Sequence, residues 1–251
     1  MGTRLEPSLE FTADVLIIGG GPAGAWAAHA AAKRGATVAL VDKGYCGTSG
    51  AAAASGVGMW FVRPNDRERE QAVNSRYVLG RFLGDQAWIA RLLDETHVGM
   101  LQLIRWGYPF PRDVSGELYL RSLQGPEYMR LMRRIVRRSG VKILDQSPAV
   151  ELLANSDGSV AGAIGIRRQT GEHWRVRSRT VVLATGGCAF RSHGLGCDVL
   201  TGDGHLMAAE AGVELAPLWW TSRKGLLSSE FRQCSREKIV QIHSRKTLSA
   251  A

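Results

Sequence analysis

The sequence lacks the features by which membrane-spanning, secreted and zinc-binding proteins are usually recognised. No apolar run approaches the roughly 18 consecutive residues that a membrane span needs, and the N-terminal stretch MGTRLEPSLEF contains no apolar signal-peptide core. The cysteines form no C-x-x-C pair and have no histidines at zinc-finger spacing: Cys46, Cys188, Cys197 and Cys234. We therefore expect a soluble, cytoplasmic protein with reduced thiols, no transmembrane segment and no metal site.

Acidic residues are fewer than basic ones, and the excess is unevenly placed. The chain has 32 Lys and Arg against 23 Asp and Glu, a formal net charge of +9. Residues 217–251 hold seven basic and two acidic residues, so more than half of the excess lies there. The main body has little basic character, and we expect no nucleic-acid partner. Five arginines at helical spacing between residues 126 and 139 are interpreted as a solvated face rather than a nucleic-acid surface: Arg130, Arg133, Arg134, Arg137 and Arg138.

A βαβ unit is predicted near the N-terminus. An apolar run, Val15 to Ile18, is followed by glycines, an alanine-rich helix from Pro22 to Arg34, and a second apolar run, Val38 to Val41. Gly35 stands where a helix C-terminus favours a left-handed residue. Strand, turn, helix and strand thus fall within about thirty residues.

The glycines of this unit fit a dinucleotide-binding pattern. Gly19 permits the tight turn, Gly21 lets the backbone approach a pyrophosphate, and Gly24 lets helix and strand pack closely. The helix N-terminus at Pro22 and Ala23 presents a positive dipole end to the phosphates. Asp42, at the end of the second strand, is placed to accept hydrogen bonds from a ribose hydroxyl. The alternative is a glycine-rich turn with an incidental strand-end aspartate, and the pattern alone does not choose between FAD and NAD.

The rest of the chain predicts an insertion and a small β-layer. Helical spacing from Asp66 to about Trp106 indicates two helices broken near Gly84, then a turn and strand pair, then a helix from Pro126 to Ser139. Short strands with hairpin turns follow: VKIL, AVELLA, SVAGAIGI and HWRVRS. RTVVLATGG is typical of a buried parallel strand. Thr201 or Asp203 is expected to cap a short helix closed by Gly212.

These elements predict an α/β, doubly wound, Rossmann-like FAD-binding domain over residues 1–216. A helical insertion is expected at about residues 60–140, a small antiparallel β-layer near residues 148–179, and an irregular basic tail over residues 217–251. The choice of FAD over a nicotinamide cofactor rests on three segments poor in side chains: GTSGAAAASG from Gly47, LATGG from Leu183, and TGDG from Thr201. Small residues let the backbone approach a flat cofactor closely.

The sequence also resembles the FAD-binding flavoprotein subunits of fumarate reductase and succinate dehydrogenase, whose relatives include L-aspartate oxidase, ketosteroid dehydrogenases and the adenylylsulfate reductase flavoprotein. The resemblance covers roughly residues 12 to 216 in DVLIIGGGPAGAWAA, VDKGYCGTSGAAAASG, GYPFPRDVSGELYLRSLQG, VVLATGGCAF and TGDGHLMAAEAGVEL. It implies that the segment from Lys43 to Gly56 wraps the FAD, with an adenine contact near Ala149. The implied cofactor contacts in that segment and on the flavin side are Thr48, Ser49, Gly50, Ala51, Ala184, Thr185, Gly186 and Asp203.

The resemblance also bears on how FAD is attached and on catalysis. Some members bind FAD covalently through a histidine just after the serine of this segment, and that position here is Gly50, so non-covalent FAD is expected. No catalytic residue is assigned. His193 and His205 lie near the flavin-side motifs and are interpreted as a loop histidine and a first-turn histidine rather than catalytic groups.

The resemblance ends after Leu215, before the capping domain that supplies an arginine proton donor and substrate-binding histidines in the family. The sequence of residues 217–251 indicates a truncated, frame-shifted or divergent terminus. The expected function is FAD-dependent oxidoreduction, with hydride transfer between flavin and a small organic substrate; fumarate or succinate is implied by the resemblance, and steroids and sulfur substrates stay open. The alternative is a non-catalytic or incomplete FAD-binding module that needs a capping domain or a partner subunit.

Overall fold

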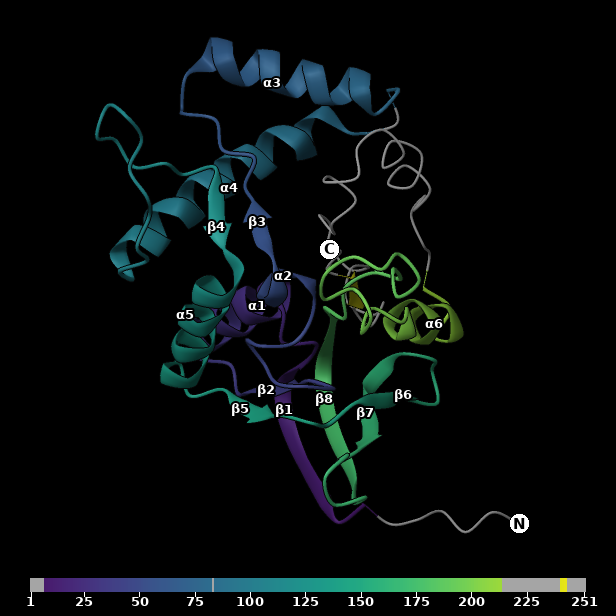
Figure 1. Ribbon diagram of the computed structural model, residues 1–251. Coiled ribbons are helices and arrows are strands. Elements are labelled where there is room, and N and C mark those ends of the chain that lie inside the picture. Colours follow the sequence, from purple (N-terminus) through teal and green to yellow (C-terminus); the bar gives the residue numbers. More distant parts are fainter. Residues whose placement is uncertain (1–6, 83, 214–239, 243–251) are drawn as a thin grey trace.

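The computed structural model describes residues 7–82 and 84–213, and the backbone of residues 240–242. At its centre is a mixed seven-stranded sheet in the order β5-β2-β1-β8-β7-β6, with β9 paired to β8 (Figure 1). The strands of this sheet are β1 (Leu9–Ile18), β2 (Val38–Val41), β5 (Lys142–Leu144), β6 (Ala149–Ala154), β7 (Val160–Ile166), β8 (His173–Leu183) and β9 (Val240–Ile242).

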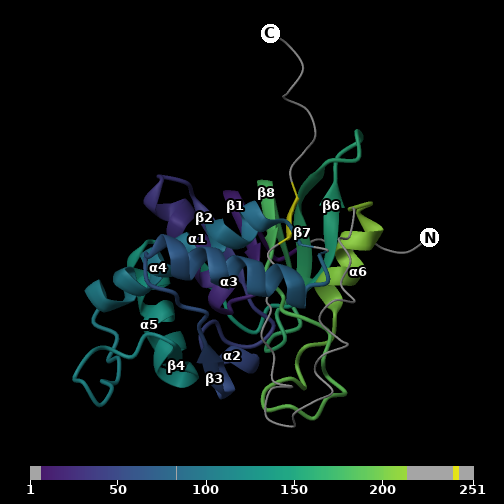
Figure 2. The same cartoon turned by 90° about the horizontal axis from the view of Figure 1, so that it is seen from above.

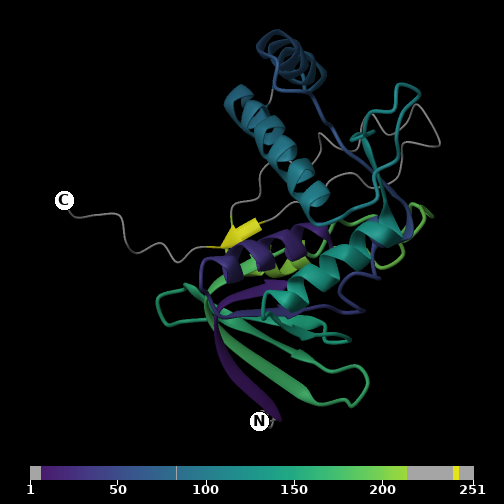
Figure 3. The same cartoon turned by 90° about the vertical axis from the view of Figure 1, so that its left-hand side faces the viewer.

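The half of the sheet formed by β5, β2, β1 and β8 is parallel and has helices on both faces. Helices α1 (Pro22–Lys33) and α5 (Gly125–Arg138) lie side by side on one face (Figure 3). The other face is covered by α6 (Asp203–Glu210). Successive side chains of β1 therefore point to opposite faces of the sheet. Ile17 belongs to the core cluster on the α1 and α5 side, whereas Leu16 belongs to the cluster that contains Trp174 and Met207. The expected doubly wound α/β architecture is confirmed.

The expected antiparallel β-layer is confirmed, but it is continuous with the parallel sheet. Two predicted strands, HWRVRS and RTVVL, are one strand, β8, which pairs with β1 along its length and with β7 over its first half. β1 likewise begins at Leu9 rather than Val15. Both strands extend through polar residues because these residues pair between β1 and β8. Glu10 of β1 forms ion pairs with Arg175 at 3.2 Å and Arg177 at 3.4 Å.

Within the predicted insertion of residues 60–140, α3 (Asp66–Leu79) and α4 (Gln86–Arg105) pack on each other (Figure 2) and extend away from the sheet (Figure 1), whereas α5 packs with α1 on the sheet. As predicted, the break between α3 and α4 contains Gly84. Each helix begins at a side-chain cap: the Asn65 side chain accepts from the Glu68 N–H at 3.1 Å, and Asp85 accepts from the Ala87 N–H at 2.7 Å. α4 contacts the core through buried Met100 and Leu103, and its Leu93 is buried between the two helices; α3 has no buried residue.

Short elements that were not predicted join the insertion to the sheet. α2 (Ala51–Ala54) leads into β3 (Gly56–Gly58), which pairs antiparallel with β4 (Ser122–Gln124). These strands have three residues each, too few for a periodic pattern in the sequence. The strand pair expected after Gly107 is reduced to a single bridge between Arg112 and Leu118.

No helix in the described ranges is long and apolar enough to cross a membrane. The cytoplasmic location stays a prediction. Of residues 217–251, only 240–242 are described, and their backbone pairs antiparallel with β8. The remaining expectation of an irregular tail lies outside the described residues, and the division at residue 216 also stays a prediction.

Candidate cofactor-binding site

A cavity of about 340 Å³ lies at the carboxyl ends of β1, β2 and β8. Open α/β sheets bind ligands at this edge, and the volume lies within the range of about 300–1,000 Å³ typical of cofactor and ligand pockets. The structure brings the following sequence-predicted residues to its lining: Gly19, Gly21, Asp42, Lys43, Ser49, Gly50, Ala51, Ala149, Ala184, Thr185, Gly186 and Asp203. Four other predicted residues do not line it: Pro22, Ala23, Gly24 and Thr48.

The glycine turn between β1 and α1 has the close packing expected of it. Gly19 has φ of +109°, and a Cβ there would lie 2.2 Å from the Ala184 carbonyl oxygen. A Cβ at Gly24 would lie 1.9 Å from the Gly19 carbonyl oxygen, so neither position accepts a side chain. Gly21 is the N-cap of α1; no side chain caps this helix and no acidic residue occupies its first turn. The helix therefore presents its positive end to an anion in the cavity.

Asp42 at the end of β2 is buried, with 8% of its surface exposed. Its Oδ2 accepts from the Gly20 N–H at 2.6 Å, and its Oδ1 accepts from the Gly44 N–H at 2.7 Å and the Ser49 hydroxyl at 3.1 Å. A carboxylate has about four acceptor positions, so one stays open for a ribose hydroxyl. Asp42 thus also fastens the glycine turn to the segment after β2, a role that the pattern in the sequence did not predict.

Lys43 and Asp203 connect two segments that both line the cavity. Lys43 Nζ donates to Thr201 Oγ1 at 2.7 Å and to Asp203 Oδ2 at 3.0 Å, and the Thr201 hydroxyl donates to the same Asp203 oxygen at 2.7 Å. Burial raises the pKa of Asp203, but hydrogen bonds from Thr201 and Lys43, with the Lys43 charge, outweigh it and bring the pKa below its ordinary value.

The expected cap of α6 is wrong. The N-cap residue is Gly202, with φ of +83°, and no side chain caps the helix. Thr201 and Asp203 are instead committed to Lys43 and to each other.

The small residues of GTSGAAAASG have two causes. Ser49, Gly50 and Ala51 line the cavity, as the cofactor argument requires. At Gly47 the cause is the packing of α5 directly on the turn. A Cβ at Gly47 would lie 2.8 Å from the Met129 carbonyl oxygen. Proximity to a cofactor therefore accounts for only part of the composition.

One arginine of α5 departs from the expected solvated face. Arg130, Arg134, Arg137 and Arg138 are exposed as predicted. Arg133 is half-buried and pairs with Asp145, with its Nη1 also donating to the Cys46 carbonyl at 2.6 Å. The Gly47 backbone, with no side chain between, packs against Arg133 Cβ and allows this approach.

Neither histidine considered for catalysis lines the cavity. His193 is exposed, with φ of +56°. His205 Nδ1 is buried and has no hydrogen-bond partner within the described residues. The lining residues that sequence reasoning missed include six from five connecting segments: Gly20, Gly44, Pro148, Arg168, Asp198 and Thr201. Gly20, Gly44 and Pro148 are adjacent in sequence to a predicted residue, and Thr201 begins the predicted TGDG segment. Arg168 and Asp198 have no such neighbour.

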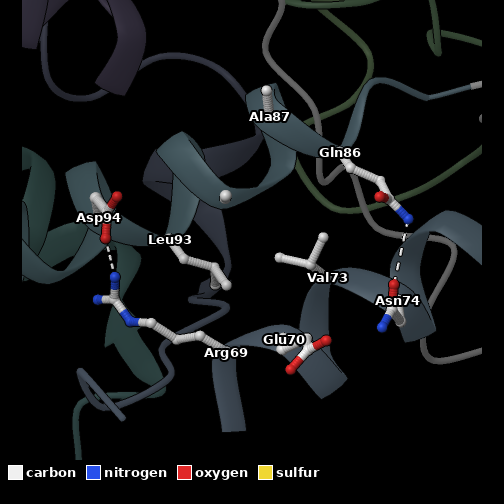
Figure 4. Close-up of a pocket in the computed structure, with 9 residues that line it drawn as sticks. Arg69, Glu70, Val73, Asn74, Gln86, Ala87, Leu93 and Asp94 are labelled. Atoms are coloured by element: carbon white, nitrogen blue, oxygen red, sulfur yellow. Dashed lines mark hydrogen bonds and ion pairs between the residues drawn. The ribbon is translucent and has the colours of Figure 1, made fainter. Parts of the chain in front are cut away.

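A second cavity, of about 410 Å³, lies between α3 and α4 (Figure 4). Arg69 forms an ion pair with Asp94 across it, and the Gln86 amide donates to Asn74 Oδ1 at 3.2 Å. Four of its polar side chains thus pair with one another between the two helices. No glycine lines it, and the N-terminus of α4 at its edge is already capped by the Asp85 side chain, so it does not share the features of the cavity at the sheet edge.

Comparisons with known proteins agree with this site. The family model described as FAD binding domain matches residues 14–222. The fumarate reductase flavoprotein subunit of Mycobacterium tuberculosis is 30% identical over 223 residues, 80% of this chain and 37% of that protein. The corresponding Escherichia coli subunit is 29% identical over 224 residues, 82% of this chain and 37% of that protein. The structure of Escherichia coli quinol fumarate reductase matches with a TM-score of 0.71 at 26% identity, over 80% of this chain and 37% of that chain.

The chain spans little more than a third of the length of these relatives. The resemblance stated from the sequence motifs is confirmed, as is FAD as the cofactor of the family. The cavity fits that cofactor, because its glycines leave backbone open to a flat ligand and the N-terminus of α1 opens on it at Gly21, where it would attract an anionic group. On the sequence match, the fold and the site together, the chain belongs to the family of FAD-binding domains.

Proposed function

We propose that this chain holds FAD non-covalently in the cavity at the sheet edge and is the FAD-binding part of a flavin-dependent oxidoreductase. The observation that carries the proposal is the meeting of the glycine turn with three segments of small residues at one cavity. When bound, FAD supplies hydride transfer to or from a substrate carbon, while the protein binds and orients it. A small acid such as fumarate or succinate is the proposed substrate class, by analogy with the relatives.

Each part of the cofactor has proposed partners. The N-terminus of α1 faces the pyrophosphate, and Asp42 takes a ribose hydroxyl. Ala149 contacts the adenine. The segment from Ser49 to Ala51 and the segment from Ala184 to Gly186 offer backbone groups to the ribityl chain and the ring, with Asp203 near the flavin side.

Non-covalent attachment rests on Gly50. Its φ of +89° is unfavourable for any residue with a Cβ, so a histidine for attachment at this position would be strained. The test is acid precipitation of the FAD-loaded protein, with absorbance read in the supernatant and pellet. All flavin is expected in the supernatant. Flavin that stays with the denatured chain contradicts the proposal.

FAD binding itself is tested by isothermal titration calorimetry of the 251-residue chain. Saturable binding at one site per chain is expected. A Gly21→Val variant serves as the matched loss-of-binding control, because a branched side chain would lie between the backbone and the pyrophosphate. The proposal is wrong if the wild-type chain does not bind FAD, or if Gly21→Val binds it equally well.

One observation favours a second candidate, a FAD-binding module that is catalytically incomplete without a capping domain or partner subunit. Among the described residues, the cavity lining has two cationic side chains, Lys43 and Arg168, against three aspartates: Asp42, Asp198 and Asp203. A dicarboxylate site needs fixed positive donors, because they stabilise the charge that develops in the transition state. The Mycobacterium tuberculosis and Escherichia coli relatives are themselves described as flavoprotein subunits.

The two candidates differ in one measurement. The FAD-loaded chain is reduced with dithionite and then mixed with fumarate or a panel of enones in a stopped-flow instrument. Reoxidation faster than that of free flavin supports an active oxidoreductase. Reoxidation at the rate of free flavin by every substrate supports the incomplete module.

A further inference from the structure

Arg168 lies on the connection between β7 and β8 and lines one end of the cavity. Its Nη1 donates to the carbonyl oxygen of Lys43 at 3.3 Å. Its main-chain N–H donates to the Gln146 carbonyl at 2.7 Å. The backbone of Arg168 is thus held against the chain that follows β5, and its guanidinium lies at the turn that follows β2.

This end of the cavity is the adenosine end if FAD binds as proposed. In a βαβ dinucleotide site the first helix takes the pyrophosphate and the acid at the end of the second strand takes the ribose. Asp42 is that acid, and Arg168 is bonded to the very next residue, Lys43. Pro148 also lines the cavity and accepts from the Ile166 N–H at 3.2 Å, so it too lies beside the β7–β8 connection.

The guanidinium of Arg168 has capacity left for a ligand. In the described part of the chain it forms no ion pair with a carboxylate, and its one hydrogen bond uses one of five N–H donors. The adjacent arginine differs in both respects, since Arg167 pairs with Glu172 at 3.5 Å and does not line the cavity. The two arginines therefore differ in their place in the fold: Arg168 lies at the cavity, and Arg167 does not.

We propose that Arg168 is a specificity-determining residue that holds the adenine of FAD by stacking its guanidinium on the ring. The inference rests on the proposed function. A guanidinium is planar and stacks on flat rings, whereas the ammonium of lysine is a compact point charge. Because Arg168 lies at the Asp42 end, its contribution belongs to the adenosine half of the cofactor and not to the flavin half.

The experiment compares four full-length chains by titration calorimetry with FAD, and with ADP as the adenosine half: wild type, Arg168→Ala, Arg168→Lys and Arg167→Ala. A lost cation–π contact is expected to raise the Kd for FAD about two- to thirty-fold in Arg168→Ala. The Kd for ADP rises by the same factor. Arg168→Lys restores less than half of the loss in log Kd, and Arg167→Ala binds like wild type.

Each outcome decides the inference. Equal FAD affinity in wild type and Arg168→Ala overturns it and leaves the proposed function intact. A loss seen with FAD and absent with ADP overturns the placement at the adenosine end. Full restoration by Arg168→Lys, with a loss that fades at high salt, replaces stacking by simple charge attraction and overturns the stacking role. A wild-type chain that binds no FAD overturns the proposed function together with this inference.

Discussion

The guanidinium of Arg133 and the carboxylate of Asp145 form a two-point ion pair, with Nη1 to Oδ1 at 2.9 Å and Nη2 to Oδ2 at 2.5 Å. The pair also holds the Cys46 backbone, because Arg133 donates to the Cys46 carbonyl and the Cys46 N–H donates to Asp145 Oδ1 at 2.8 Å. Only 27% and 20% of the two side chains are exposed. Helix α5 is thereby fastened to the turn that leads into the cavity.

Replacing Arg133 by alanine is expected to lower the free energy of unfolding by about 1.5–3 kcal/mol, the range for hydrogen bonds to charged groups. The loss arises because Asp145 and the Cys46 carbonyl would be left without their partner. Urea unfolding measures it. Arg134→Ala, an exposed change on the same helix, is the matched control and is expected to stay within about 0.5 kcal/mol of wild type. Equal losses in the two variants would contradict the role of the pair.

The same turn makes Cys46 unreactive. Burial, followed by the negative charge of Asp42, raises its pKa to about 12 despite the opposing charge of Arg133. The reactive thiolate is therefore almost absent at pH 8. Iodoacetamide at pH 8, followed by peptide mapping, is expected to label exposed Cys188 in the native chain and to leave Cys46 unlabelled until urea unfolds it. Native labelling of Cys46 at the rate of Cys188 would contradict this environment.

The parts of the fold that could be predicted from the sequence are those with local causes. The βαβ unit follows from apolar runs and glycines within thirty residues, and its boundaries match closely: α1 begins at Pro22 and β2 spans Val38–Val41. The continuity of β8 could not be predicted, because the alternating pattern of HWRVRS changes at Ser178 and Arg179 to the continuous apolar run of RTVVL. The charges of HWRVRS are satisfied by Glu10, which lies 165 residues away from Arg175 in sequence.

The candidate site shows the same division. The small residues predicted where the cavity lies, but they did not show which of them line it. Gly47 is small because α5 packs on it, whereas Gly50 lines the cavity. Arg168 gave no signal in the sequence, because one arginine in a hairpin turn beside another has no distinguishing pattern. Its place beside Lys43 depends on how β7 and β8 pair with the rest of the sheet.

Replacing a helical glycine by alanine is expected to raise the stability of the chain at one position and to lower it at another. Gly204 in α6 packs on Thr185, and a Cβ there would lie 2.0 Å from Thr185 Oγ1. Gly99 in α4 has no atom within 4 Å of the same position. Gly99→Ala is expected to stabilise the chain by about 0.5–1 kcal/mol through helix propensity. Gly204→Ala is expected to destabilise it by about 1–3 kcal/mol, the cost of overpacking. Thermal unfolding compares them, and stabilisation by both changes would show that α6 does not pack on Thr185.

The ion pair between Lys43 and Asp203 predicts a loss of stability in acid. Because the pKa of Asp203 is lowered in the folded chain from the ordinary 3.8, its contribution is present above about pH 4 and is lost as the pH falls through the lowered pKa. Asp203→Asn is therefore expected to be less stable than wild type at pH 7, by no more than about 1 kcal/mol because the pair is partly exposed. The difference should shrink as the pH falls through the lowered pKa, because the protonated carboxyl of Asp203, like the amide of the variant, carries no charge. Urea unfolding at pH 7, 5, 3 and 2 measures it, with Asp198→Asn as the control, a cavity-lining aspartate without an ion pair in the described ranges. A difference that stays constant to pH 2, or an equal pH dependence in Asp198→Asn, would show that the Lys43–Asp203 pair is not its source.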